Sequence, residues 1–239
     1  MTAPRLTCND LSNGYGGVPV IADVNISVSQ GECVAVLGRN GVGKTTMART
    51  IAGILGRPLM GTVVYEGSDV TAWSTDTRAR MGITYAPDDR GVFRQLTVEE
   101  NLKLATRRVG APSIATVAED VPDILAARWR HRAEQLSGGE QQILAIACAL
   151  AASPRLLVID ELSEGLSTRA IAMVEAWLGR RVAEGLSVLL IEQRVDLALR
   201  LATRCYVMDF DGGRGTIVLE ADAATLRDDS SVLLKLLAL

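Results

Sequence analysis

The sequence is poor in the residues that bind transition metals through nitrogen or sulfur. It contains one histidine, His131, and four cysteines, which are Cys8, Cys33, Cys148 and Cys205. The cysteines lie far apart along the chain and form no CxxC pair. Cysteines of this kind commonly pack inside strands and helices, and we expect that role here in place of a metal site.

Long apolar runs are also missing. No stretch reaches the roughly 18 consecutive apolar residues of a membrane-spanning helix. The opening "MTAPRLTCND" lacks the apolar core of a signal peptide. The formal net charge of -3 gives no general attraction to nucleic acid or to an anionic membrane. We therefore expect a cytoplasmic protein that has no nucleic-acid partner.

The chain does contain enough apolar material for a large core. Its 239 residues are 48% hydrophobic, which fits one large domain or a domain with an inserted subdomain. Three short β-rich runs within residues 5–36 are separated by glycine-rich turns. They predict an antiparallel start that leads into a buried strand.

Two kinds of hydrophobic pattern divide the rest of the chain. Residues 97–151 are mostly helical in pattern, with breaks near Pro112 and Pro122. From residue 156 onward, strand patterns alternate with helical patterns, which favours a parallel α/β sheet. The predicted elements are strands at 155–160, 187–192 and 204–210, helices at 168–185 and 196–203, and a short apolar helix at 231–239 that packs onto the domain.

A glycine-rich loop, "GRNGVGKT", lies directly between an apolar strand and a helical pattern at 44–56. Glycines let backbone N–H groups turn inward around phosphates, and the following helix adds its positive amino end. In such a loop Lys44 reaches the β- and γ-phosphates and Thr45 binds Mg²⁺ through its hydroxyl. A glycine-rich turn with a chance lysine is the alternative. The predicted phosphate-binding residues are Gly38, Asn40, Gly41, Gly43, Lys44, Thr45 and Thr46.

Two acidic residues end the strand predicted at 155–160. In "RLLVIDE", Asp160 is placed to hold a Mg²⁺ ion, and the adjacent Glu161 is placed to polarise an attacking water. Acids at this position can instead cap the next turn, but beside a phosphate loop the hydrolytic interpretation is favoured. The two motifs together predict nucleotide hydrolysis with ATP and Mg²⁺.

A third motif, "LSGGEQQ", precedes the apolar helical run at 143–152. Ser137 and Glu140 form an S-x-x-E capping box, which is common and starts helices without any further function. Ser137 with Gly138 and Gly139 at a helix amino end also makes a second anion cradle. One nucleotide would seldom need two cradles on the same chain.

The three motifs, in this order and spacing, resemble those of the ATP-binding cassette (ABC) ATPases. "GRNGVGKTT" is similar to Walker A, "LSGGEQQ" to the signature sequence and "LLVIDE" to Walker B. The resemblance implies an α/β fold with a RecA-like P-loop NTPase core, an antiparallel β subdomain and an inserted α-helical subdomain. We predict one domain over 1–239, with the core and β subdomain at about 1–87 and 152–239 and the helical subdomain at about 88–151. The resemblance also implies a head-to-tail dimer, in which each ATP lies between the Walker A motif of one subunit and the signature sequence of its partner.

Further positions of the family can be placed on this sequence. Tyr15 matches the aromatic residue that stacks on adenine, although a packed tyrosine at a strand edge is the alternative. Residues 163–167 match the loop that crosses the dimer interface. Many relatives have a proline and an aspartate where this chain has Leu162 and Ser167.

Two positions depart from the family pattern near the γ-phosphate. Asp88 stands where most relatives have a glutamine that contacts Mg²⁺ and relays to the transporter, and a solvated loop acid is the alternative. Gln193 stands where a histidine usually contacts the γ-phosphate. Its amide can donate a hydrogen bond but cannot shuttle a proton. Glu161 is therefore the only strong candidate for the general base.

The segments "GVFRQLTVEENL" and "IEQ" resemble those of the family branch that serves branched-chain amino acid importers and their urea or short-chain amide relatives. This implies a homo- or heterodimer on the cytoplasmic face of the membrane, two integral-membrane permeases and, indirectly, a solute-binding protein. Val92, Phe93 and Leu96 are candidate permease contacts, or else core. A soluble ABC ATPase without a permease and a weakly hydrolysing subunit of a heterodimer are the alternatives.

Overall fold

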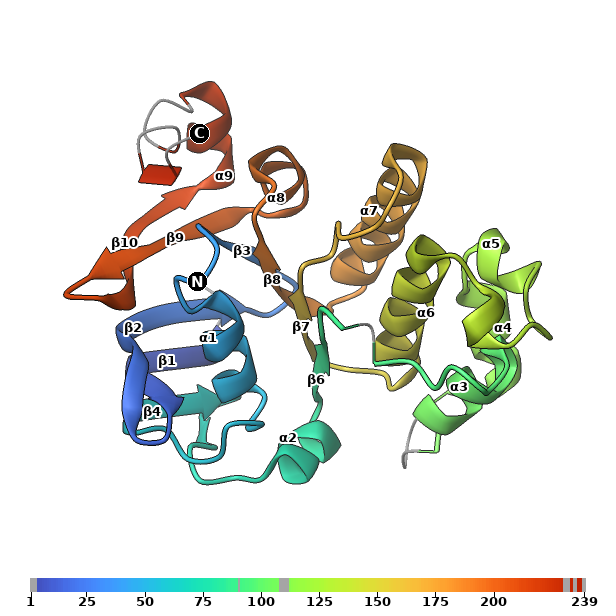
Figure 1. The fold of residues 1–239 in the computed structure, drawn as a ribbon, viewed down its shortest axis with the longest axis horizontal. Coiled ribbons are helices and arrows are strands. Elements are labelled where there is room, and N and C mark those ends of the chain that lie inside the picture. Colours follow the sequence, from blue (N-terminus) through green and yellow to red (C-terminus); the bar gives the residue numbers. More distant parts are fainter. Residues whose placement is uncertain (1–3, 90, 108–111, 230–232, 234–235, 238–239) are drawn as a thin grey trace.

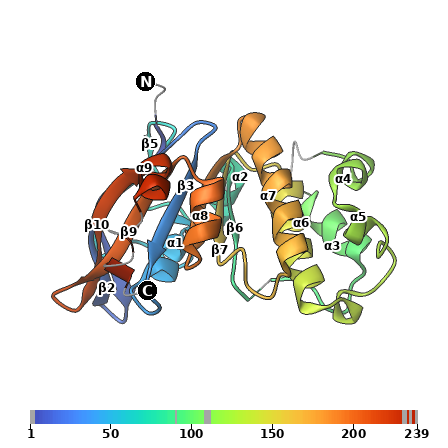
Figure 2. The same ribbon diagram turned by 90° about the horizontal axis from the view of Figure 1, so that it is seen from above.

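The computed structural model describes residues 4–89, 91–107, 112–229, 233 and 236–237. Over these residues one mixed sheet runs through the molecule, in the strand order β5-β4-β1-β2-β10-β9-β3-β8-β7-β6 (Figures 1 and 2). The strands are β1 Pro4–Tyr15, β2 Val18–Ser29, β3 Cys33–Gly38, β4 Met60–Tyr65, β5 Ser68–Asp69, β6 Ile83–Ala86, β7 Leu156–Asp160, β8 Ser187–Glu192, β9 Arg204–Asp211 and β10 Arg214–Asp222.

Parallel strands β3, β8, β7 and β6 form one continuous part of the sheet, and β9 continues it in parallel beside β3. Strands β3, β7 and β8 are buried along their whole length. Their side chains alternate between two cores, so Val36 packs with helix α1 (Lys44–Ile51), while Leu190 packs with helices α7 (Thr168–Ala183) and α8 (Val195–Leu201). The predicted parallel α/β core is confirmed.

The amino-terminal part of the sheet is antiparallel. Strands β1 and β2 form a hairpin, and β4 pairs with the other edge of β1. Strand β10 pairs antiparallel with β9 and touches β2 through Gly215 and Ile21. A Cβ atom at Gly215 would lie 1.7 Å from the carbonyl oxygen of Val42, so only glycine allows β10 to pass the glycine-rich loop so closely.

Helices between residues 98 and 151 gather in a lobe beside the sheet (right side of Figure 1). They are α3 Val98–Ala105, α4 Ile114–Asp120, α5 Asp123–Ala126 and α6 Gly138–Ala151. Helix α3 packs against α4 and α6, and α6 also packs against β6. The helical character of this segment agrees with its sequence pattern, while the predicted subdomain limits at 88 and 151 stay a prediction.

Some elements differ from those expected from the sequence. Helix α1 ends at Ile51 and does not reach residue 56, because Gly53 and Gly56 have φ of 78° and 72°. Helices α2 (Thr75–Met81) and α9 (Ala223–Asp228) and strand β10 were not predicted. Their polar, short or glycine-containing sequences give weak hydrophobic periodicity, and long-range pairing stabilises β10 in the sheet.

The buried cysteines agree with the predicted packing role. Cys8 and Cys33 are buried, and burial raises the pKa of each thiol to about 12, so both stay neutral. In the predicted tail helix, Leu233 and Leu237 are buried in the core, whereas most of residues 230–239 lie outside the described residues. No helix of the described chain is both long and apolar enough to cross a membrane.

Candidate nucleotide site

The glycine-rich loop connects the end of β3 to the start of α1. Gly41 and Gly43 have φ of 80° and 107°, a region that residues with a Cβ rarely adopt. A Cβ at Gly43 would also lie 2.5 Å from a side-chain carbon of Ile21. The loop therefore holds a turn at the amino end of α1, where backbone N–H groups favour a phosphate.

Lys44 is the buried cation of this loop, with only 5% of the residue exposed. Its ammonium donates hydrogen bonds to the carbonyl oxygens of Gly38 at 2.7 Å and Arg39 at 3.0 Å. Burial lowers the pKa of Lys44, and the nearby carboxylates of Glu161 and Asp160 oppose that shift without cancelling it. The site thus combines one buried cation with acidic groups from neighbouring strand ends.

Asp160, at the end of β7, is fully buried. Its Oδ2 accepts a hydrogen bond of 2.9 Å from the hydroxyl of Tyr85, and the side chain of Thr45 lies close enough to favour the charged form of the carboxylate. Burial nevertheless raises the pKa of Asp160, and the charges of Asp88 and Glu161 add to that shift.

The other carboxylate oxygen of Asp160, Oδ1, has no hydrogen-bond partner among the described residues. A buried acceptor oxygen that lacks a donor, with a threonine hydroxyl nearby, fits a hard cation, while the acidic, histidine and cysteine side chains of the described residues form no group of three that could bind a metal by themselves. Thr45 and Asp160 are therefore the residues that would hold Mg²⁺ in this protein.

Glu161 follows β7 in an uncommon backbone conformation, with φ of 56°. A glutamate in this left-handed region is strained and is held by its surroundings. The N–H of Glu161 donates to the carbonyl of Ile191 at 3.0 Å, and Gln142 donates to the Glu161 carbonyl at 3.3 Å. The side-chain amide of Gln193 donates directly to the Glu161 carboxylate.

Asp88 lies at the edge of the same site. Its carboxylate is 3.6 Å from the guanidinium of Arg49, and its negative charge contributes to the raised pKa of Asp160. Contact with Tyr85 raises the pKa of Arg49, and Tyr15 contributes to the same shift. Arg49 is thus a shared neighbour of Asp88 and the predicted adenine-stacking residue.

Tyr15 is 50% exposed at the end of β1, which leaves ring surface open for stacking. The predicted roles of Asp88 and Tyr15 stay predictions.

The "LSGGEQQ" segment begins α6 as a capping box. The hydroxyl of Ser137 accepts from the Glu140 N–H at 3.2 Å, and the Glu140 carboxylate accepts from the Ser137 N–H at 2.7 Å. Glu140 also lies 3.5 Å from Arg128. A Cβ at Gly139 would be 2.9 Å from the Gly165 carbonyl, so glycine permits close packing on the loop after β7.

These contacts keep the segment in the helical lobe, apart from α1 in Figure 1. The structure brings Lys44, Thr45, Asp160, Glu161 and Gln193 together, whereas Ser137 and Glu140 have their described contacts elsewhere. The glycine-rich loop and the "LSGGEQQ" segment therefore lie in separate parts of the chain.

A family profile described as ABC transporter matches residues 21–164 of the chain. The chain belongs to the ABC transporter family. It is 35% identical to the high-affinity branched-chain amino acid transport ATP-binding protein BraG of Pseudomonas aeruginosa, over 95% of this chain and 97% of that protein. It is 32% identical to the lipopolysaccharide export system ATP-binding protein LptB of Escherichia coli, over 85% of this chain and 86% of that protein.

A solved structure of the ATP binding subunit of an ABC transporter has the same fold. It is 28% identical, with a TM-score of 0.79, and the match covers 95% of this chain and 93% of the other. This ABC protein is therefore an ATP-hydrolysing subunit, as its motifs predicted, and it has the fold of an ABC ATPase cassette.

Sequence reasoning missed several residues of the ABC site. Tyr85, on β6, contacts Asp160, and Gln142, on α6, contacts the Glu161 backbone. No sequence signal indicates these long-range contacts. Glu192 ends the buried strand β8 beside Gln193, and this position is its sequence signal, but no pattern in the sequence indicates the partners of its carboxylate.

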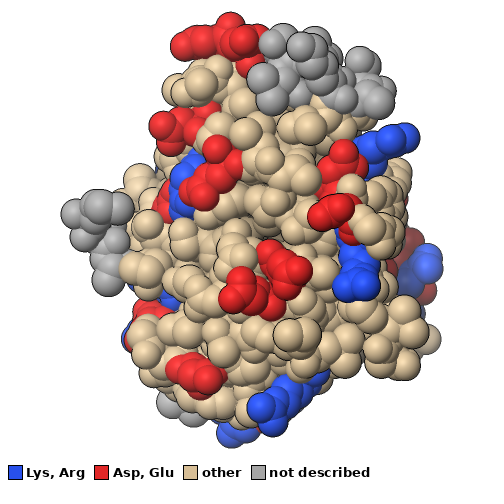
Figure 3. Space-filling view, turned by 90° about the vertical axis from the view of Figure 1, so that its left-hand side faces the viewer, with Lys and Arg blue, Asp and Glu red and all other residues tan. Residues whose placement is uncertain are grey.

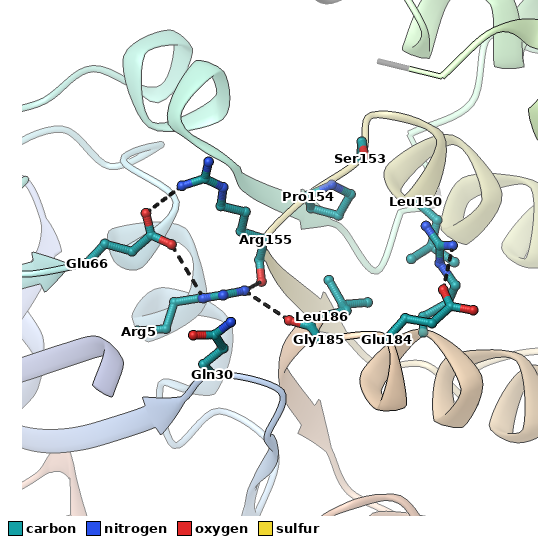
Figure 4. Close-up of a pocket in the computed structure, with 11 residues that line it drawn as sticks. Arg5, Gln30, Glu66, Leu150, Ser153, Pro154, Arg155, Glu184, Gly185 and Leu186 are labelled. Carbon is teal, nitrogen blue, oxygen red and sulfur yellow. Dashed lines mark hydrogen bonds and ion pairs between the residues drawn. The ribbon is translucent and has the colours of Figure 1, made fainter. Parts of the chain in front are cut away.

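A separate polar cavity of about 530 Å³ lies at the opposite end of β7 and β8, where Figure 4 shows Arg5, Glu66 and Arg155. Each of these groups already has partners. Arg5 donates to the carbonyls of Arg155 at 2.6 Å and Gly185 at 3.1 Å, and Arg155 lies 2.8 Å from Glu66. The hydrogen bonds and ion pair of these lining residues connect the antiparallel part of the sheet to the parallel core. The cavity contains no part of the nucleotide site.

Proposed function

We propose that this chain is the ATP-hydrolysing subunit of an ABC importer for branched-chain or other hydrophobic amino acids, with urea or short-chain amides as related solutes. The observation that carries the ATPase mechanism is the meeting of Lys44, Asp160, Glu161 and Gln193 in one site. The similarity to BraG and to LivF of Archaeoglobus fulgidus, a probable branched-chain amino acid transport ATP-binding protein, supports the solute class.

In the proposed reaction the amides at Gly41 and Gly43 and the ammonium of Lys44 bind the β- and γ-phosphates. Thr45 and Asp160 would hold Mg²⁺, which would supply positive charge against the phosphates. Asp88, 3.6 Å from Arg49 at the edge of the site, would accept a hydrogen bond from water near the metal.

Glu161 orients the attacking water and accepts its proton. Gln193, whose amide donates to Glu161, would donate its second amide hydrogen to the γ-phosphate and thereby hold water and phosphate in line. Because an amide has no titratable proton, Glu161 alone performs the base step.

A dimer completes the proposed site. The cradle of Ser137, Gly138, Gly139 and Glu140 from a second, identical or related subunit would cover the ATP held by the glycine-rich loop. Tyr15 would stack on the adenine. Hydrolysis then releases the contact that the γ-phosphate makes across the interface.

The permease contact is proposed at the loop before α3. Phe93 is 61% exposed, whereas Val92 and Leu96 are less exposed. Val92 also packs against the core. Phe93 is therefore the stronger candidate of the three to contact an integral-membrane partner. Such contacts, with two permeases and indirectly a solute-binding protein, would hold the chain at the cytoplasmic face of the membrane.

Figure 3 shows one face of the molecule, with acidic and basic side chains interspersed on a largely uncharged surface. This face has no single-sign patch that would attract a nucleic acid. The expectation that the protein has no nucleic-acid partner stays a prediction.

The test of the proposed function is to purify the tagged protein from membranes of its native cell and to identify the proteins that accompany it. Copurifying permeases, and loss of branched-chain amino acid uptake when Lys44→Ala replaces the native chain, are the expected results. Copurification with a lipopolysaccharide export apparatus, which the similarity to LptB makes a specific competitor, would overturn the solute class. Soluble partners alone would overturn the importer.

A further inference from the structure

Glu192 ends β8 as an almost fully buried carboxylate, with 1% of the residue exposed. Its oxygens accept hydrogen bonds from the Ser163 N–H at 2.8 Å, the Ser163 hydroxyl at 3.3 Å, the Gln193 N–H at 3.0 Å and the Arg194 N–H at 3.1 Å. These donors provide the compensation that a buried charge requires. The carboxylate is thus bound by backbone N–H groups and a hydroxyl of the protein itself.

The donors belong to two different loops. Ser163 lies two residues after Glu161, and Gln193 and Arg194 begin the loop after β8. The guanidinium of Arg194 does not approach Glu192 in the described contacts, since it pairs with Asp196 at 2.9 Å. Glu192 therefore bridges the backbones of two loops and is not part of an ordinary ion pair.

The same two loops carry the side chains that meet at the site. Glu161 has φ of 56°, and such a conformation persists only where several contacts fix the chain around it. The bond from the Glu161 N–H to Ile191 fixes one side, and the bond from the Ser163 N–H to Glu192 fixes the other. Leu162, between these contacts, is fully buried.

We propose that Glu192 is a positioning residue for ATP hydrolysis: its carboxylate joins the backbones of Ser163 and Gln193 and so holds the side chains of Glu161 and Gln193 together. This inference rests on the proposed role of Glu161. Glu192 acts through these neighbours and does not touch the nucleotide. Its removal should therefore affect turnover and leave ATP binding in place.

The direct test is Glu192→Gln, which keeps the size of the side chain but turns one acceptor oxygen into an NH₂ group that faces N–H donors. We expect kcat to fall about ten- to hundred-fold, because hydrogen bonds to a charged group are lost at the junction. The Kd for ATP should stay within about threefold of the wild-type value or become tighter, since a negative charge near Lys44 is removed.

Glu32→Gln is the matched control. Glu32, just before β3, also accepts a backbone N–H, that of Ser29 at 2.7 Å, but it lies at the opposite end of the parallel strands from the nucleotide site. Its kcat should stay within about twofold of the wild-type value. A folded Glu192→Gln variant with kcat within about threefold of wild type would overturn the proposal. So would a rise of the Kd for ATP in step with the loss of turnover, which is the mark of a merely structural residue.

Glu161→Gln, measured in the same series, separates this inference from the function on which it rests. If Glu161→Gln is inactive and Glu192→Gln is not, only the present inference fails. If Glu161→Gln retains turnover, the role of Glu161 fails and the inference fails with it.

Hydrogen exchange on the wild-type protein tests the junction even where the Glu192→Gln variant does not fold. Ser163 and Gln193 are only partly buried and Arg194 is exposed, yet their amides each donate to Glu192. We expect these three amides to be protected from exchange. Exchange at the rate of an unprotected loop would contradict the proposal.

Discussion

Glu161 and Gln193 show how one site is assembled from two strand ends. They follow β7 and β8, adjacent parallel strands paired through Asp160 and Ile191, and their side chains are in contact. Because the carboxyl ends of parallel strands meet at one edge of the sheet, residues 32 positions apart share a hydrogen bond. The amide at residue 193 donates without carrying a charge at any pH.

Gln193→His should therefore remain active and acquire a new dependence on pH. An imidazole titrates near pH 6.5, so a step of kcat in that region is expected in the variant and not in the wild type. The measurement is kcat against pH for both proteins. Loss of ATP binding in the folded variant would contradict the placement of residue 193 beside the γ-phosphate.

Tyr85 supports Asp160 through the hydrogen bond of 2.9 Å between its hydroxyl and Oδ2. Tyr85→Phe removes that donor from a fully buried carboxylate, so the orientation of the proposed Mg²⁺ ligand Asp160 is lost. We expect the Mg²⁺ concentration for half-maximal ATPase activity to rise about tenfold, as for other partners of metal ligands.

Tyr206→Phe is the control for this prediction. The Tyr206 hydroxyl is also engaged, with the Ser27 N–H at 3.0 Å and Arg204 at 2.7 Å, but on β9 away from Asp160. It should leave the Mg²⁺ requirement unchanged. An equal shift in both variants would mean that the effect of Tyr85 is one of general stability.

At the scale of elements, the amino end of α6 has two roles, one in stability and one proposed in ATP binding. Ser137 caps the helix, and the same residue belongs to the cradle proposed for a partner's nucleotide. Ser137→Ala should lower the free energy of unfolding by about 1 kcal/mol through the lost cap. It should also reduce ATPase activity more than that small loss of stability explains.

Ser113→Ala separates these effects. Ser113 caps α4 through the same hydroxyl contact, accepting from the Thr116 N–H at 3.2 Å, but without the reciprocal carboxylate that Glu140 provides at α6. Urea unfolding and ATPase rates of both variants are the measurement. Similar unfolding free energies with a loss of activity only in Ser137→Ala are expected, and similar activities would refute the cradle.

The sequence was sufficient to predict the elements whose signal is local. The apolar runs of β7 and β8, the glycine turn before Lys44 and the capping box at Ser137 each lie within a few residues. Their structures match because burial, backbone freedom and capping depend mainly on nearby residues.

Elements stabilised by distant partners could not be predicted in this way. Arg78 is buried on α2 and donates to the carbonyls of Thr50 and Ile51 at 2.9 and 2.6 Å, so it caps the last turn of α1 from 27 residues away. An arginine in "TDTRARM" carries no sign of this role. The partners of Glu192 and the pairing of β10 likewise depend on the complete fold.

At the scale of the whole molecule, Arg204 links several strands. It contacts Glu32 before β3 at 3.0 Å, the Ser27 carbonyl on β2 at 2.8 Å, and Glu220 on β10. Burial opposes ionisation of Glu32, but hydrogen bonds from Arg204 and the Ser29 N–H outweigh it and hold the pKa of the Glu32 carboxyl below its usual range.

This shift gives stability a dependence on pH. Because the pKa of Glu32 is lower in the folded state, its contribution is complete above the unfolded pKa of about 4.3 and is lost as the pH falls through the folded value. Glu32→Gln should therefore flatten the fall of the unfolding free energy below about pH 4.3. Urea titrations at several pH values measure it, and an unchanged slope would contradict the role of this ion pair.

The ATPase as a whole is best tested at Glu161, because the proposed mechanism gives the base step to that residue alone. The measurement is steady-state ATP hydrolysis by Glu161→Gln, with ATP binding measured on the same protein. We expect a loss of turnover of at least about a hundredfold with ATP still bound, as is usual when a general base is removed. Turnover within about tenfold of the wild type would contradict the role of Glu161 as the base.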